Sequence, residues 1–197
     1  MPVSAPILPQ SSAIDRIKGF AIAQSRSLWN YLKMSTALLF AQVAASTAIT
    51  GATETSTAFD SYYTIKANAP EAGSVIRGRA WGKHTACAGG ETHTLALKIG
   101  SVAVFTSANI TPTTNDYWEI DFEIVFRTVG ASGTMVARAF MRNGASAAAG
   151  TPLYYYLDST AVDTTADNIL AVYMDRQASA TDSDSARQDC MIVVSMS

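Results

Sequence analysis

Apolar and polar side chains alternate along residues 117–129, which form the clearest pattern in the chain. Five large apolar residues share one face of this stretch: Trp118, Ile120, Phe122, Ile124 and Phe126. Charged residues share the other face: Glu119, Asp121, Glu123 and Arg127. A two-residue period predicts a β-strand with one buried face. Gly130 and Gly133 suit a tight connection to a second strand over residues 134–142, so the sequence predicts a long antiparallel hairpin.

Short strands separated by polar or glycine-containing turns are predicted throughout the chain after residue 46. Besides the hairpin, they cover residues 47–50, 56–67, 74–83, 92–99, 102–106, 153–157, 169–176 and 189–196. Small residues on one side of 74–83, including Gly78 and Gly82, are expected to leave room for a closely packed opposite sheet. Nine or ten strands without a helix predict an all-β fold, a two-sheet antiparallel β-sandwich of the jelly-roll type.

The first 46 residues follow a different pattern. Three prolines, Pro2, Pro6 and Pro9, predict an extended arm at the start of the chain. Apolar residues are dense over residues 28–43 but have no clean period. This segment is either a strand and a helix that complete the domain's own core, or an arm laid across a neighbouring subunit. We therefore expect an N-terminal arm over residues 1–46 and a sandwich domain over residues 47–197.

Charged residues make up only 15% of the chain, and the net charge is −2. Such a weakly charged surface suggests that other protein chains cover much of it. The 14 basic residues are scattered, which argues against nucleic-acid binding. The apolar run at residues 37–45 is far shorter than the roughly 20 residues that span a bilayer, so no membrane segment is expected. Asp15, Arg16 and Lys18 do not fit a secretion signal, which predicts a protein made in a cytoplasm.

Two groups of side chains resemble metal sites without matching one. The first contains both histidines of the chain: His84, Cys87, Glu91 and His93. It lacks the spacing of known zinc motifs, so an ordinary exposed loop is favoured. The second is Asp182, Asp184 and Asp189, which lack the glycine and the bidentate acid of a calcium loop. No metal or cofactor is expected. Cys87 and Cys190 are either buried thiols or a disulfide.

Catalytic motifs are missing from the sequence. There is no Gly-x-Ser-x-Gly turn, and neither histidine has a context that pairs it with a serine and an aspartate. Glu119, Asp121 and Glu123 suggest the paired carboxylates of a glycoside hydrolase. Regular alternation with apolar residues explains them as the outer face of a strand, so the chain is not expected to be an enzyme.

Aromatic residues are expected on the outside of the sheets. They are Trp81, Phe105, Tyr154, Tyr155 and Tyr156. A contact between subunits is the favoured interpretation. A second layer of the domain itself and a platform for sugar stacking are the alternatives.

Four stretches after residue 46 resemble the small trimeric jelly-roll proteins of tailed bacteriophage virions, namely capsid decoration or cement proteins and fibre heads. The stretches are Thr47 to Phe59, Pro70 to Gly82, Thr94 to Gly100, and Trp118 to Ile120 leading to Arg127 to Thr134. The resemblance implies a homotrimer with a structural role and transfers no site residues. A decoration trimer uses an N-terminal arm to reach across capsid subunits, whereas a fibre uses its N-terminus to attach to the tail. The short leader lacks shaft-building repeats and favours decoration.

The sequence thus predicts a non-enzymatic virion protein that binds the major capsid protein or another virion protein. Apolar residues of the arm are the expected anchors: Ile7, Leu8, Ile14, Ile17, Phe20, Leu28 and Trp29. A tail-associated head that binds a carbohydrate receptor is the alternative, and a polysaccharide hydrolase is a third class.

Overall fold

Eleven β-strands make up the regular structure of the described part of the chain. The computed structural model describes residues 37–50, 56–87, 92–111, 113–144, 153–176 and 185–196. The strands are β1 (Ala37–Ala41), β2 (Thr57–Ala58), β3 (Tyr63–Ile65), β4 (Val75–Ala86), β5 (His93–Ile99), β6 (Val102–Thr106), β7 (Tyr117–Thr128), β8 (Gly133–Gly144), β9 (Leu153–Val162), β10 (Asn168–Arg176) and β11 (Ser185–Met196). Within these residues, no helix has the length and apolar character needed to cross a bilayer.

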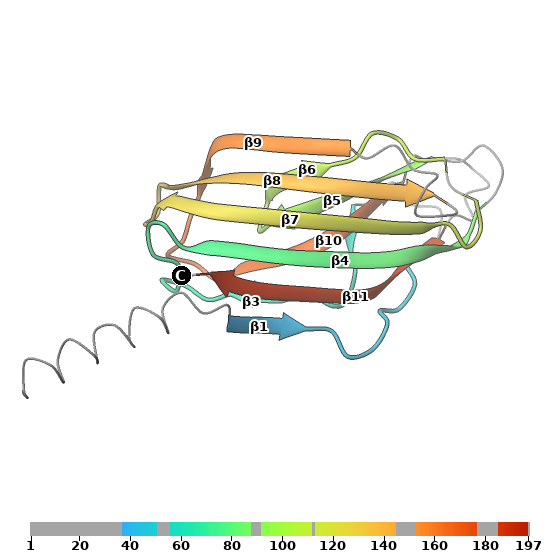
Figure 1. Cartoon of the computed structure of the whole chain (residues 1–197), viewed down its shortest axis with the longest axis horizontal. Coiled ribbons are helices and arrows are strands. Elements are labelled where there is room, and N and C mark those ends of the chain that lie inside the picture. Colours follow the sequence, from blue (N-terminus) through green and yellow to red (C-terminus); the bar gives the residue numbers. More distant parts are fainter. Residues whose placement is uncertain are drawn as a thin grey trace, which may run out of the picture. The chain divides into compact units, whose positions relative to one another are not determined.

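The strands form two antiparallel sheets that pack face to face (Figure 1). The larger sheet has the order β1-β11-β4-β7-β8-β9, and the smaller has the order β2-β10-β5-β6, with β3 also paired to β10. The strand order of a jelly roll is present in the two facing sheets: β1-β11-β4-β7 in the larger and β3-β10-β5-β6 in the smaller. The strands β8 and β9 extend the larger sheet beyond β7. The predicted all-β sandwich is confirmed.

The predicted hairpin is the pair β7 and β8, which is antiparallel from Tyr117 and Gly144 to Thr128 and Thr134. The apolar row of β7 lies in the core between the sheets: Trp118, Ile120, Phe122, Ile124 and Phe126 are all buried. The other sheet contributes buried aliphatic residues: Leu95, Leu97, Leu170 and Val172. Burial of this one face explains why the alternation is so regular in the sequence.

The small residues of β4 make room within their own sheet rather than for the opposite one. Gly78 is paired with Phe122, and Gly82 with Trp118, on the neighbouring strand β7. A Cβ atom at either glycine would overlap the facing aromatic ring. The Trp118 ring in turn stacks on Phe59 at 5.5 Å between ring centroids. The expectation about the opposite sheet is therefore corrected: glycine lets large rings of β7 lie across β4.

The sandwich includes Ala37–Ala41, which lie before the predicted boundary after residue 46. Strand β1 pairs with β11, and Leu39 and Phe40 pack against the core. The backbone then stays beside β11, because the Gln42 and Ser46 amides donate to the Met191 and Gln188 carbonyls at 2.8 and 2.7 Å. Of the two interpretations of residues 28–43, completion of the domain's own core holds for residues 37–41. Residues 28–36 lie outside the described ranges.

Candidate binding site on the outer face of the larger sheet

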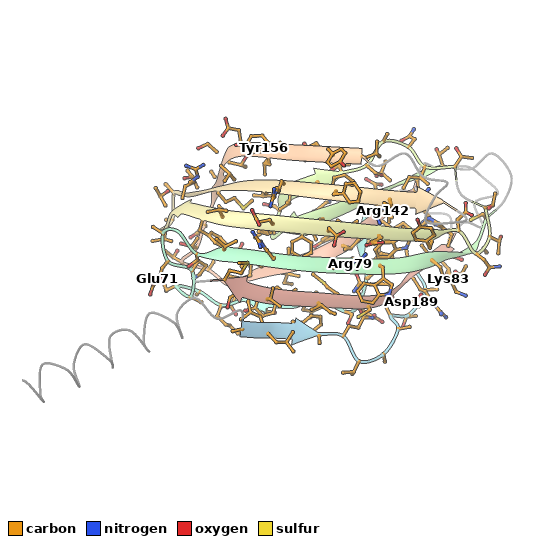
Figure 2. All side chains as sticks on the ribbon, in the orientation of Figure 1. Glu71, Arg79, Lys83, Arg142, Tyr156 and Asp189 are labelled. Atoms are coloured by element: carbon orange, nitrogen blue, oxygen red, sulfur yellow. The ribbon has the colours of Figure 1, made fainter. Side chains whose placement is uncertain are left out.

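The outer face of the larger sheet is hollowed over its centre. The hollow has a volume of about 780 Å³ and is lined by side chains of β4, β7, β8, β9 and β11. Alternate side chains of a strand point to opposite faces, so the residues that do not face the core gather here. Figure 2 shows Arg79 and Arg142 on this face, over β4 and β8.

A ladder of ion pairs crosses the hollow. Arg77 binds Glu123, and Arg79 binds Glu119 and, through Nε, Asp121 Oδ1 at 3.4 Å. From the other side, Arg138 Nη2 donates to Glu123 Oε2 at 3.2 Å. The β-sheet register places the partners opposite or nearly opposite one another on adjacent strands. Each such pair adds little to stability because the arginines are half exposed, but together the pairs orient the side chains.

The carboxylates considered for glycoside hydrolysis are therefore held by arginines. Glu119, Asp121 and Glu123 lie in the outward row that alternation predicts, and each has an arginine partner. Only 12% of the Glu119 side chain is exposed, because its neighbours cover it.

Arg142 differs from the other three arginines of the hollow. Among the described residues it forms no ion pair, because its cross-strand neighbour Glu119 binds Arg79 instead. Its guanidinium carbon lies 4.8 Å from the centroid of the Phe140 ring. The Phe140 ring meets Tyr154 on β9, with centroids 5.0 Å apart and a tilt of 52°. One cation and two aromatic rings thus form a continuous group on the surface. Sequence reasoning missed Phe140 and Arg142, although the outward row Arg138, Phe140, Arg142 is visible as alternation.

The three consecutive tyrosines of β9 divide between the two faces. Tyr154 and Tyr156 point outward and are 80% and 65% exposed. Tyr155 points the other way and meets Phe105 edge-on at 5.8 Å. Trp81 is half-buried on the outer face, 5.9 Å from the Arg79 guanidinium. Three of the predicted surface aromatics thus lie on one face of the sheet.

Phe105 is in the core, not on the surface as predicted. Its side chain is 1% exposed. The register between β5 and β6 shifts between Leu97 and Lys98, and this irregularity breaks the alternation of β6. Val104 and Phe105 are consequently both buried. Phe105 cannot contact another subunit.

Strand β9 is an edge of the larger sheet in the described part of the chain, where it pairs with β8 alone. It is ten residues long, and Asp158 is its one charged residue. Natural edge strands are commonly protected by charges, proline or short length. An exposed edge rich in tyrosine has the composition of an interface.

The two histidines are buried side by side, which corrects the prediction of an exposed loop. His84 from β4 and His93 from β5 are both 0% exposed, and their rings lie 4.7 Å apart between the two sheets. His84 Nε2 is 3.0 Å from Asn143 Oδ1. Burial lowers the pKa of both, and for His93 the neighbouring His84 and Arg176 bring it to about 3. Both rings are therefore neutral near pH 7.

No three His, Cys, Asp or Glu side chains converge on a possible metal position in the described ranges. Glu91, Asp182 and Asp184 lie outside those ranges, and Asp189 accepts from Arg187 Nε at 2.7 Å. Cys87 and Cys190 are not joined in a disulfide. The predicted anchors of the arm, Ile7, Leu8, Ile14, Ile17, Phe20, Leu28 and Trp29, all lie outside the described residues.

Comparison with known proteins identifies no family for the chain. No family model matches it, and no curated protein does. Among solved structures, it is similar to the winged bean acidic lectin complexed with methyl-α-D-galactose, at 8% identity and a TM-score of 0.31. The match covers 82% of this chain and 98% of the lectin. This likeness is too distant to indicate function.

Proposed function

We propose that the chain is a non-enzymatic structural protein of a tailed bacteriophage virion. In this proposal the jelly roll forms a homotrimer that decorates the capsid, and the residues before β1 hold neighbouring capsid subunits. The proposal draws on the resemblance of four sequence stretches to such proteins. The observation that carries it is the edge strand β9, which pairs with β8 alone in the described structure and exposes Tyr156, so that its open edge suits contact with another protein.

The mechanism is mass action. A trimer that binds the assembled shell but not its free subunits stabilises the shell by the free energy of those contacts. Three linked arms raise the effective concentration of each arm once the first is bound. The open edge of β9, with the outward Tyr156, is the proposed contact between subunits and leaves the centre of the outer face uncovered, whereas the arm supplies the contacts to the capsid.

Deletion of residues 1–33 separates these two roles, because it leaves β1 from Ala37 to Ala41 intact. The shortened protein is expected to fold and to form trimers, but not to bind capsids in a co-sedimentation assay. A second deletion through residue 45 serves as the control, since it also removes β1 and should destabilise the sandwich. Binding of capsids by the first variant at full-length affinity would rule out the arm as the anchor.

A receptor-binding head on the tail is the second candidate function. The hollow with Arg142, Phe140 and Tyr154 favours it, because exposed aromatic rings beside polar groups suit a sugar. This candidate function predicts that the isolated domain binds cells or glycans and that the protein lies on the tail.

A further inference from the structure

We infer that the hollow on the outer face of the larger sheet binds an acidic saccharide, with Arg142 receiving its carboxylate and Tyr154 and Phe140 supporting its ring. The inference goes beyond the decoration role and holds for a protein on either the head or the tail. It gives the second candidate function a ligand class.

Charge in the hollow is not balanced. Four arginines line it, at positions 77, 79, 138 and 142, and two carboxylates, at positions 121 and 123; a third carboxylate, Glu119, lies beside it and pairs with Arg79. The three carboxylates are shared among the first three arginines. Arg142 is the cation left over in the described structure, so an anionic group on a ligand would meet an uncompensated charge. A guanidinium binds a carboxylate through two parallel hydrogen bonds.

The aromatic rings beside Arg142 favour a sugar over a simple anion. Phe140 lies under the guanidinium of Arg142. Tyr154 extends this aromatic surface and is itself 80% exposed. The polar tip and apolar body of tyrosine suit a ligand with both hydroxyl groups and C–H surface. The ion-pair ladder beside these two rings offers hydrogen-bond donors and acceptors to the hydroxyl groups of a sugar.

The paired backbone beneath the hollow favours a saccharide over an extended peptide. Its volume of about 780 Å³ is within the range of small-molecule sites. The floor is a sheet whose backbone groups are already paired, so a peptide could not add to it as a strand there. An extended peptide would find its hydrogen bonds at the edge of β9 instead.

The test measures binding of the full chain to sialylated, glucuronic-acid and galacturonic-acid oligosaccharides by calorimetry. Each is compared with the same oligosaccharide after reduction of its carboxyl group to an alcohol. We expect at least one acidic oligosaccharide to bind at least tenfold more tightly than its reduced form. Arg142→Gln should weaken acidic binding about 10- to 100-fold and abolish this preference, as for loss of a charged hydrogen bond. Tyr154→Ala should weaken both forms.

Arg127→Gln is the matched control, because Arg127 is exposed on the same strand as the acidic row but does not line the hollow. Its binding should equal that of the wild type, and melting curves should show all three variants folded. Absence of binding across the panel, equal binding of acidic and reduced forms, or an unaffected Arg142→Gln would overturn the inference. Binding of a polyglutamate peptide, with no binding of any saccharide, would assign the hollow to an acidic protein segment instead. Any of these results leaves the decoration proposal standing, because capsid attachment is assigned to the arm.

Discussion

Acid should weaken the sandwich through the buried histidine pair. His93 has a pKa of about 3 in the folded protein, against 6.5 as its ordinary value. Its folded pKa is depressed, so its contribution to stability is fully present above pH 6.5 and is lost as the pH falls toward 3. Between pH 8 and pH 5 the loss from His93 alone is about 2 kcal/mol, which corresponds to roughly 4–8 °C in melting temperature. His84, whose pKa is also lowered, adds to the loss.

The other charged groups that face the histidine pair do not change the direction of this pH dependence. Asp116 raises the pKa of His84 but does not outweigh burial, and Arg176 further lowers the pKa of His93. Asp163 and Asp167, whose pKa values hydrogen bonds lower, act only at more acidic pH, since their ordinary value is 3.8. The interval from pH 8 to pH 5 therefore isolates the histidines.

The assay is urea unfolding at a series of pH values and one protein concentration, followed by tryptophan fluorescence. A fixed concentration is needed because assembly would itself add stability. Between pH 8 and pH 5, the free energy of unfolding of His93→Gln should fall by about 2 kcal/mol less than that of the wild type. A wild-type free energy of unfolding that stays level over this interval, or a variant with the wild-type slope, would refute the reasoning.

Two further predictions concern packing. Gly82→Ala should cost about 1–3 kcal/mol in urea unfolding, because the added methyl overlaps the Trp118 ring and the backbone of β11; a variant as stable as the wild type contradicts this packing. Phe105→Ala should cost about 3–5 kcal/mol, as for a core aromatic residue. By contrast, Tyr156→Ala should change the stability of the fold by under about 0.5 kcal/mol while weakening self-association in sedimentation experiments. If instead Tyr156→Ala destabilised the fold and Phe105→Ala weakened only self-association, the assignment of Phe105 to the core would be contradicted.

The core of the fold could be predicted from the sequence where alternation is long and one face is buried. The row from Trp118 to Phe126 repeats often enough that its register and hairpin follow directly. Phe105 could not be placed in this way, because a single register shift between β5 and β6 reverses the face of the residues after it. Strand β1 is five residues long, too short for its period to be recognised.

The candidate site depends on choices between strands that a linear sequence does not contain. Arg142 and Glu119 are neighbours across β7 and β8, so a charge pair would be the simple expectation. Arg79 from β4 binds Glu119 instead, and only the three-dimensional structure reveals the arginine that is left over. The meeting of His84 and His93 likewise depends on which strands of the two sheets face one another.

Electron cryomicroscopy of the virion tests the central claim most directly. The account predicts density for trimeric jelly rolls on the outer surface of the head, with each arm reaching between capsid subunits. The same density on the tail would support the receptor-binding candidate and contradict decoration. Virions that lack this density altogether would contradict both.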